Sequence, residues 1–282
     1  MHQGLHFISG LPRSGSTLLS AILRQNPRFH AAMSSPVVSM YSSLERSMSP
    51  RNEFAIVITD EQRRDVLRGL FSNYYGAIAA EKLVFDTNRG WCAKLPALTQ
   101  LFPNAKIICC VRSVGWIIDS IERLVRANAF NLSGIFGFSP STNVYTRAAR
   151  ITAPTGMLGY PLCALKEAFY GEQAAKLILV EYEALARAPR STIGRLYAML
   201  DEPWFEHDFD HVEYGADEFD SRMGTPGLHS IRPTVDWVER KSIVPPDLFQ
   251  RFDKDTFWNA PDAGACQVPI IRFDGETASA LS

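Results

Sequence analysis

The sequence contains no long apolar run and no surplus of basic charge. Nowhere in its 282 residues are there the roughly 18 consecutive apolar residues that a membrane span needs, and residues 1–7 lack the apolar core of a signal peptide. Its 29 basic and 30 acidic side chains give a formal net charge of −1, whereas a dedicated nucleic-acid binder needs excess Lys and Arg. We therefore predict a cytoplasmic protein with no membrane span and no nucleic-acid partner, which must hold any anion at a local site.

Cysteine is also scarce, and its pattern predicts no metal site. The five cysteines show no C-x-x-C pair and no histidine pairing of the zinc type. Cys109 and Cys110 lie inside an apolar run, which is typical of small core residues in a reducing compartment. Apolar residues make up 46% of the chain, an ordinary globular share. A length of 282 residues allows one or two domains, and we expect a single one spanning residues 1–282.

Four short apolar runs predict buried strands, and three of them lead into helical patterns. Strands that alternate with amphipathic helices predict an α/β fold with a parallel sheet flanked by helices, in which ligands bind beyond the carboxyl ends of the strands. Ser191 is predicted to cap the last helix. The expected strands are residues 5–9, 83–85, 106–111 and 176–180, and the helical patterns cover residues 18–23, 117–125 and 193–200.

Two long segments, residues 31–50 and 127–161, do not fit that alternation. The first is rich in Ser, Met and Pro, and the second mixes Gly, Ser, Thr, Asn and Pro with isolated aromatic residues. Long irregular segments inside a compact domain are usually working loops or disordered. We predict that both are loops that shape an acceptor pocket, with simple surface padding as the alternative.

The most informative segment is residues 7–19, where a strand ends at Gly10, a loop turns through Gly15 and a helix begins near Ser16. Such a loop points successive backbone N–H groups and the positive end of the helix dipole at one place, which makes an anion site. Both glycines and Thr17 fit the nucleotide-binding pattern G-x-x-x-x-G-K-[ST], but a serine stands at the lysine position. Without that lysine, triphosphate chemistry is poorly supported, whereas binding of a 5′-phosphate group is not.

The cation of this loop is Arg13, whose forked guanidinium can hold a phosphate or a group being transferred from it. Residues 11–19 (Leu-Pro-Arg-Ser-Gly-Ser-Thr-Leu-Leu) resemble the 5′-phosphosulfate loop of sulfotransferases that depend on 3′-phosphoadenosine 5′-phosphosulfate (PAPS), above all the branch containing tyrosylprotein sulfotransferases. The resemblance implies a three-layer architecture like that of P-loop nucleotide kinases, PAPS as sulfuryl donor and adenosine 3′,5′-bisphosphate as product. The donor contacts that it implies in this loop are Arg13, Ser14, Gly15, Ser16 and Thr17.

A second segment resembles the family's 3′-phosphate element independently of the first. It comprises residues 101–112, followed eight residues later by Ser120. Arg112 lies at the carboxyl end of a predicted strand and Ser120 in the early turns of the next helix, an arrangement that predicts a pincer for a second phosphate.

Two further segments resemble the same family. Residues 179–185 do so, which implies that Tyr182 lies near the 3′-phosphate side of the nucleotide; the alternative is an aromatic side chain that packs on the next helix. Residues 230–237 resemble the loop that folds over the nucleotide and ends in Asp-Trp, although the family's Arg-Lys-Gly is absent from them. Ser230 or Arg232 would supply a phosphate contact there.

Transfer of a sulfuryl group to an acceptor hydroxyl or amine needs an acceptor held in line, positive charge on the bridging oxygens, and a base for the acceptor's proton. No metal is required. Arg13 and the helix N-terminus meet the need for positive charge. The base is the difficulty, because tyrosylprotein sulfotransferases carry a glutamate about twenty residues beyond the loop arginine, and here that register holds Ser34 and Ser35.

Residues 84–91 fall where relatives place a catalytic lysine or histidine, and neither stands in that register. Our hypothesis is that Asp86 acts as base or orienter and that Arg89 helps to hold the sulfonate or the acceptor. The structural alternative is that Asp86 caps a turn and pairs with Arg89. His30 and His229 are reserve candidates for the base.

Two other functions stay open at this point. One is a small-molecule or nucleotide kinase with a degenerate P-loop, and the other is a nucleotide-binding module without turnover. We expect a small molecule or a peptide as acceptor, because a net charge of −1 without a basic run disfavours a highly sulfated polyanion. A small or lipid-like alcohol, a phenol and a peptide tyrosine all stay open. A homodimer is left open.

Overall fold

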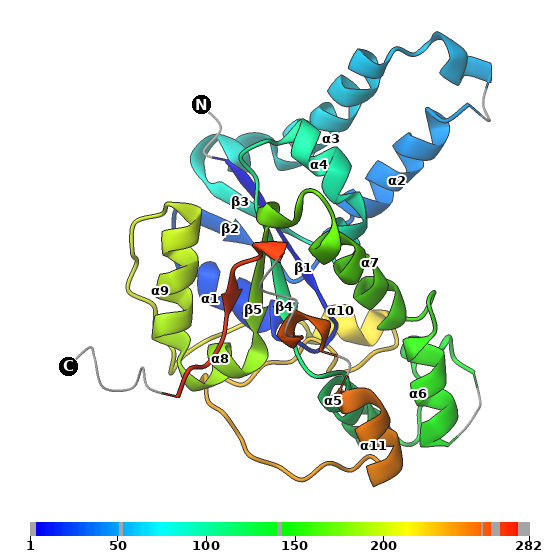
Figure 1. Cartoon of the computed structure of the whole chain (residues 1–282), viewed down its shortest axis with the longest axis vertical. Helices are drawn as coiled ribbons and strands as arrows, with labels where there is room; N and C mark the ends of the chain where they lie inside the picture. Colours follow the sequence, from blue (N-terminus) through cyan, green and yellow to red (C-terminus); the bar gives the residue numbers. More distant parts are fainter. Residues whose placement is uncertain (1–3, 51–52, 140–142, 255, 261–265, 276–282) are drawn as a thin grey trace.

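A six-stranded parallel sheet forms the centre of the chain (Figure 1). The computed structural model describes residues 4–50, 53–139, 143–254, 256–260 and 266–275. The strand order is β2-β3-β1-β4-β5-β6, and every neighbouring pair is parallel. The strands are β1 Leu5–Gly10, β2 Phe29–Ala31, β3 Leu83–Thr87, β4 Ile107–Val111, β5 Leu177–Glu181 and β6 Ile270–Ile271. The four predicted strands are confirmed, and the sequence missed β2 and β6, which are too short to show a pattern.

Helices cover both faces of the sheet and complete the predicted three-layer architecture (Figure 1). Side chains alternate along each strand, so Phe7 packs into the core under α3, α4, α5 and α7, while Ile8 packs into the core under α1 and α9. No helix in the described ranges is both long and apolar enough to cross a bilayer. The helices are α1 Ser16–Leu23, α2 Val37–Ser47, α3 Asp60–Glu81, α4 Leu95–Leu101, α5 Val114–Ala127, α6 Val144–Thr152, α7 Gly159–Tyr170, α8 Tyr182–Arg187, α9 Pro189–Leu200, α10 Asp217–Arg222 and α11 Pro246–Asp253.

Three local expectations were wrong. The segments 31–50 and 127–161 are not irregular throughout, because they contain α2 and α6. Only two residues of α2 are buried, Val37 and Tyr41, so its apolar stripe is too thin to stand out in the sequence. Ser191 lies inside α9 rather than at its cap, because the helix already starts at Pro189, whose fixed φ suits the first helical position.

The sheet topology brings four strand ends to one place. The chain runs from the central β1 to β2 and β3 on one side and then to β4 and β5 on the other. Parallel strands end at the same edge, and the loops after β1, β3 and β4 meet there with the first residue of α8. The point at which a parallel sheet changes direction is where ligands bind in such folds.

At Gly10, the last residue of β1, the backbone lies very close to the backbone of β4. Gly10 adopts φ 100°, and a Cβ on it would lie 2.3 Å from the carbonyl oxygen of Cys110 on β4. We expect Gly10→Ala to lower the free energy of unfolding by about 3 kcal/mol, from left-handed strain and overpacking together. Gly69→Ala is the matched control, because a Cβ on this helical glycine would meet only the Asn73 side-chain amide, at 3.9 Å, and alanine should raise stability by about 0.5–1 kcal/mol. Urea unfolding of both variants measures the difference, and equal stabilities would contradict the expectation.

Candidate active site

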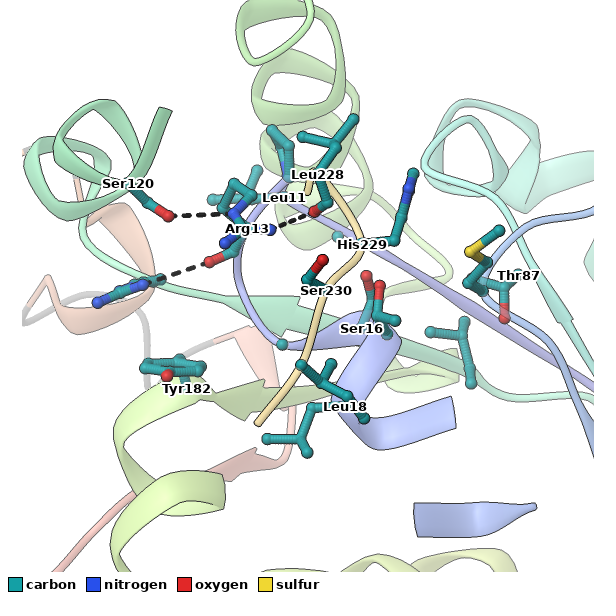
Figure 2. Close-up of a pocket in the computed structure, with 18 of the residues that line it drawn as sticks. Leu11, Arg13, Ser16, Leu18, Thr87, Ser120, Tyr182, Leu228, His229 and Ser230 are labelled. Carbon is teal, nitrogen blue, oxygen red and sulfur yellow. Dashed lines mark hydrogen bonds between the residues drawn. The ribbon is translucent and has the colours of Figure 1, made fainter. Parts of the chain in front are cut away.

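A cavity of about 430 Å³ opens at the carboxyl edge of the sheet. Its walls come from the loops after β1, β3 and β4, from the start of α8, and from the C-terminal segment 228–240 (Figure 2). The volume lies in the range of about 300–1,000 Å³ that is usual for small-molecule sites. Every predicted donor contact except Ser14 lines this cavity.

The loop after β1 has the geometry of an anion cradle. Arg13 has a left-handed φ of 57° and Gly15 a φ of 94°, directly before α1 begins at Ser16. A left-handed non-glycine residue costs about 1–2 kcal/mol, and such strain is concentrated at functional sites. A Cβ on Gly15 would lie 3.1 Å from the ring of Tyr182, so glycine is what lets the ring close over the loop. Ser14 is buried and its hydroxyl donates to the carbonyl of Pro12 at 3.4 Å, so its side chain is not available to an anion in the cavity.

The side chain of Arg13 joins three segments that are far apart in the sequence. Nε donates to Ser120 Oγ on α5 at 3.0 Å, and Nη1 donates to the carbonyl oxygen of Leu228 (Figure 2). Burial lowers the pKa of Arg13, and Arg240 lowers it further, while Tyr182 opposes both. The sequence assigned Ser120 to the 3′ element alone, whereas the structure connects this hydroxyl to the cation of the 5′ loop.

Arg112 lies beside the same loop, at the end of β4. Its guanidinium stacks on the ring of Tyr182, 4.2 Å from the centroid, and Nη1 reaches the carbonyl of Arg13 at 3.5 Å. Burial lowers the pKa of Arg112 to about 10; Tyr182 opposes the shift, and the nearby Arg240 and Arg13 add to it. Like charges that depress each other's pKa in a concave site are typical of a site for an anion.

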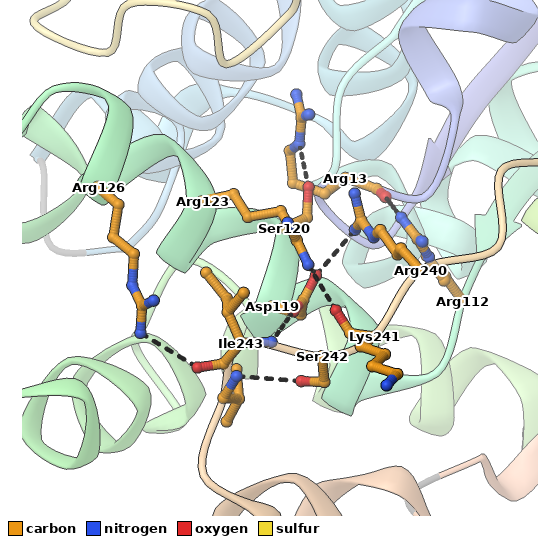
Figure 3. Close-up of polar contacts among 11 residues, drawn as sticks. Arg13, Arg112, Asp119, Ser120, Arg123, Arg126, Arg240, Lys241, Ser242 and Ile243 are labelled. Atoms are coloured by element: carbon orange, nitrogen blue, oxygen red, sulfur yellow. Dashed lines mark hydrogen bonds and ion pairs between the residues drawn. The ribbon is translucent and has the colours of Figure 1, made fainter.

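A third arginine of this cluster, Arg240, was not predicted from the sequence. It lines the cavity and is held by Asp119, a fully buried carboxylate of α5, at 3.0 Å (Figure 3). Asp119 also accepts from Arg123 Nε at 2.9 Å and from the backbone N–H of Ile243 at 2.8 Å. This carboxylate therefore anchors the C-terminal segment across the cavity. The available signal was the Arg-Lys pair at residues 240–241, three positions after the Asp-Trp ending.

Three arginines in the cavity wall have no described acidic side chain in direct contact, although Asp220 raises the pKa of Arg13 and Asp119 that of Arg112 from a greater distance. Arg13, Arg89 and Arg112 all line the cavity, and none forms an ion pair with an acidic side chain in the described part of the chain. Among the residues that the structure describes, Arg89 donates only to the carbonyl of Met157, at 3.4 Å, and burial lowers its pKa. Buried charge without a counterion is costly, so this cavity is suited to a ligand with several negative groups.

The C-terminal segment contributes Ser230 and Arg232 to the lining, as predicted. Arg232 is half-exposed and already paired with Asp236 at 2.6 Å, so of the two it is the less available for a phosphate. Trp237 also lines the cavity, 6.1 Å from the ring of Tyr182, and its buried indole N–H has no partner among the described residues. Two aromatic rings thus lie next to the arginine cluster.

Asp86 does not line the cavity. Its carboxylate is fully buried and accepts from Ser35 Oγ at 2.8 Å, from Tyr75 OH at 2.6 Å and from Trp91 Nε1 at 2.7 Å. Burial raises the pKa of Asp86, and the three donors lower it. It neither faces an acceptor nor pairs with Arg89, so its placement fits an anchor for the segments around it and not a base.

The two reserve histidines lie in different places. His30 lies outside the cavity lining and packs 5.8 Å from the ring of Tyr75, whereas His229 lines the cavity. Of the described residues in the two long segments, only Met33, Ser34 and Met157 reach the wall. Within the described ranges, no group of three or more His, Cys, Asp or Glu side chains is arranged to hold a metal ion.

Comparisons with known proteins agree with this geometry. The family model described as "Sulfotransferase family" matches residues 6–206. The chain is 25% identical over 268 residues to "Protein-tyrosine sulfotransferase A" of Caenorhabditis elegans, covering 88% of this chain and 63% of that protein. It is 25% identical over 242 residues to "Protein-tyrosine sulfotransferase 1" of Danio rerio, covering 83% of this chain and 62% of that protein. The chain thus spans less than two thirds of the length of these relatives.

A solved structure supports the fold. The "Sulfotransferase Domain from the Curacin Biosynthetic Pathway" superimposes with a TM-score of 0.54 at 19% identity, covering 92% of this chain and 99% of that one. At this identity the likeness concerns the fold alone.

Proposed function

The chain belongs to the sulfotransferase family, and from this premise we propose that it is an enzyme that moves a sulfuryl group from PAPS to an acceptor hydroxyl or amine by in-line transfer. The observation that carries the proposal is the convergence of Arg13, Arg89 and Arg112, without acidic partners in the described part of the chain, on one cavity. A donor with a 3′-phosphate and a 5′-phosphosulfate supplies negative groups at two separated points. When bound, it also supplies the sulfur–oxygen bond to be broken.

Different residues of the cavity wall suit the 5′ and the 3′ end of the donor. The backbone N–H groups at residues 14–17, together with the dipole of α1, suit the 5′-phosphate, and Arg13 suits the bridging oxygens on which charge develops. Arg112, Arg240 and Ser120 suit the 3′-phosphate. Arg89 stands apart from that cluster, on the loop after β3, where it would hold the sulfonate or the acceptor.

We propose a phenolic hydroxyl, such as a tyrosine in a peptide, as the acceptor to test first. Two relatives are named protein-tyrosine sulfotransferases, and this coarse likeness favours a protein or peptide acceptor. The cavity wall also includes Met33 and Met157, a residue type whose thioether suits contact with an aromatic ring. A small phenol remains the alternative acceptor.

Transfer of labelled sulfate from PAPS to a tyrosine peptide or to a small phenol tests the function directly. A thermal shift comparison precedes it, in which adenosine 3′,5′-bisphosphate should stabilise the protein more than ATP with Mg²⁺. A larger shift with ATP and Mg²⁺ would favour the kinase. Binding of the bisphosphate without transfer to any acceptor would favour a non-catalytic nucleotide module.

Arg112→Ala tests the assignment of the 3′ end. We expect the variant to bind adenosine 3′,5′-bisphosphate about 10- to 100-fold more weakly, because a charge-assisted contact to phosphate is lost. Its affinity for adenosine 5′-monophosphate should hardly change, since that ligand lacks the 3′-phosphate. Arg190→Ala is the matched control, because Arg190 is exposed and pairs with Glu206 away from the cavity. Calorimetric titration of both ligands gives the two affinities, and an equal loss for both would refute the assignment.

A further inference from the structure

We infer that His229, oriented by Asp220, is the general base that takes the acceptor's proton. The inference rests on the proposed sulfuryl transfer and assigns the role for which the sequence offers no glutamate in register. The carrying observation is that His229, which lines the cavity, is paired with Asp220, a buried carboxylate of α10 that lies outside the lining.

Asp220 fixes the imidazole of His229 through two contacts. The carboxylate is fully buried; Oδ1 lies 2.5 Å from Nδ1 of the ring, and Oδ2 accepts the backbone N–H of the same histidine at 2.7 Å. An ionised carboxylate only accepts, so the proton of the neutral ring lies on Nδ1. Nε2 then carries the free electron pair and has no hydrogen-bond partner among the described residues. This is the arrangement that a carboxylate imposes on a histidine base.

The other titratable side chains of the cavity wall are unsuited to the role. The only acid lining it within the described ranges is Asp236, which is half-exposed and paired with Arg232. Tyr182 lies under the guanidinium of Arg112, at the end assigned to the 3′-phosphate. The remaining ionisable groups there are arginines, which hold their protons. His229 is left as the group able to accept a proton.

The position of His229 also fits the acceptor end. In Figure 2, His229 and Thr87 lie on the opposite side of segment 228–230 from Ser120 and Tyr182, which belong to the 3′ end. Arg13 donates to the carbonyl of Leu228, the residue immediately before the histidine. Arg13, the cation assigned to the leaving phosphate, is thus hydrogen-bonded to the peptide group that links Leu228 to His229, the proposed base.

The step balances with these groups. Nε2 of His229 accepts the proton of the acceptor hydroxyl while the acceptor oxygen forms its bond to sulfur. The bond between sulfur and the 5′-phosphate oxygen breaks, and its electron pair stays on the phosphate, next to Arg13. His229 later releases the proton to water, so Asp220 is a positioning residue that needs no proton of its own.

The kinetic test uses two acceptors that differ in acidity, a tyrosine peptide and 4-nitrophenol, with PAPS as donor. We expect His229→Ala to lower kcat on the peptide by about 10²–10⁴-fold, the usual contribution of a general base. The loss on 4-nitrophenol should be at least about tenfold smaller, because an acidic phenol ionises with less help. Asp220→Asn should show the same dependence on the acceptor, and both variants should bind adenosine 3′,5′-bisphosphate like the wild type.

The chain supplies a matched control at His211. Its Nδ1 and backbone N–H contact the carboxylate of Asp208 in the same way, at 3.0 Å each, but the pair is exposed and lies outside the cavity. His211→Ala should keep full activity on both acceptors. Equal losses on the two acceptors for His229→Ala, or no loss, would overturn the dyad and leave the proposed function standing. A wild type that transfers sulfate to neither acceptor and does not hydrolyse PAPS would remove both proposals.

A second readout needs neither donor nor acceptor. At alkaline pH, ¹⁵N NMR of labelled histidine in the protein alone reports which ring nitrogen is protonated. We expect His229 in the Nδ1–H form in the wild type and a shift toward the Nε2–H form in Asp220→Asn, whose amide can donate to Nδ1. A wild-type ring protonated on Nε2 would overturn the inference whatever the kinetics show.

Discussion

Replacing Arg13 by alanine should lower kcat for sulfuryl transfer by about 10²–10³-fold, the usual effect of removing one donor from developing negative charge. The loss should fall on kcat more than on donor affinity, because the backbone N–H groups at residues 14–17 and Arg112 remain to bind the two phosphates. Alanine also relieves little strain, since the left-handed φ of 57° is disfavoured for it as well. Steady-state kinetics with varied PAPS separates the two parameters.

The controls for Arg13→Ala follow from its contacts. Arg13→Lys keeps the charge, but an ammonium group cannot donate to Ser120 and to the carbonyl of Leu228 in the way that the forked guanidinium does. Its kcat should therefore lie between that of Arg13→Ala and that of the wild type. Ser120→Ala removes one anchor of the side chain and should have a smaller effect than loss of the arginine. Wild-type kcat in Arg13→Ala, with an unchanged melting temperature, would take this residue out of the mechanism.

The parts of the site that the sequence predicted are local. The loop from Gly10 to Thr17 is contiguous, so its glycines and hydroxyls stand at fixed spacings that any reader of the sequence can count. Arg112 and Tyr182 were also predicted, because each directly follows a buried strand and the ends of parallel strands share one edge. The four longer strands were recognised for the same reason, since strands buried on both faces form continuous apolar runs.

The parts that were missed depend on contacts between distant segments. Arg240 reaches the cavity only because Asp119, on α5, holds its segment there, and no spacing in the chain records that pairing. The partner of His229 lies nine residues before it on a six-residue helix, and nothing in the sequence distinguishes Asp220 from its acidic neighbours. The role of a histidine in a cavity depends on the carboxylate that pairs with it, so from the sequence His229 was only a reserve candidate for the base.

Asp86 shows the opposite outcome, a residue for which the structure supports a different role from the one first predicted. Asp86→Ala should lower the free energy of unfolding by about 3–5 kcal/mol, because it leaves three buried donors, from Ser35, Tyr75 and Trp91, without an acceptor. These donors come from the loop before α2, from α3 and from the turn after β3. Their loosening should also displace Ser34 and Arg89 in the cavity wall. Urea unfolding measures the loss.

Asp86→Asn separates an anchor from a base. The indole N–H of Trp91 can keep its bond to the remaining oxygen, and the hydroxyls of Tyr75 and Ser35 can turn to accept from the new amide, since a hydroxyl both donates and accepts. The variant should therefore lose only about 1–2 kcal/mol of stability, and kcat should stay near the wild-type value. A base replaced by an amide loses its function even when the fold survives. A stable Asp86→Asn protein with almost no turnover would return Asp86 to the mechanism and leave His229 without its role.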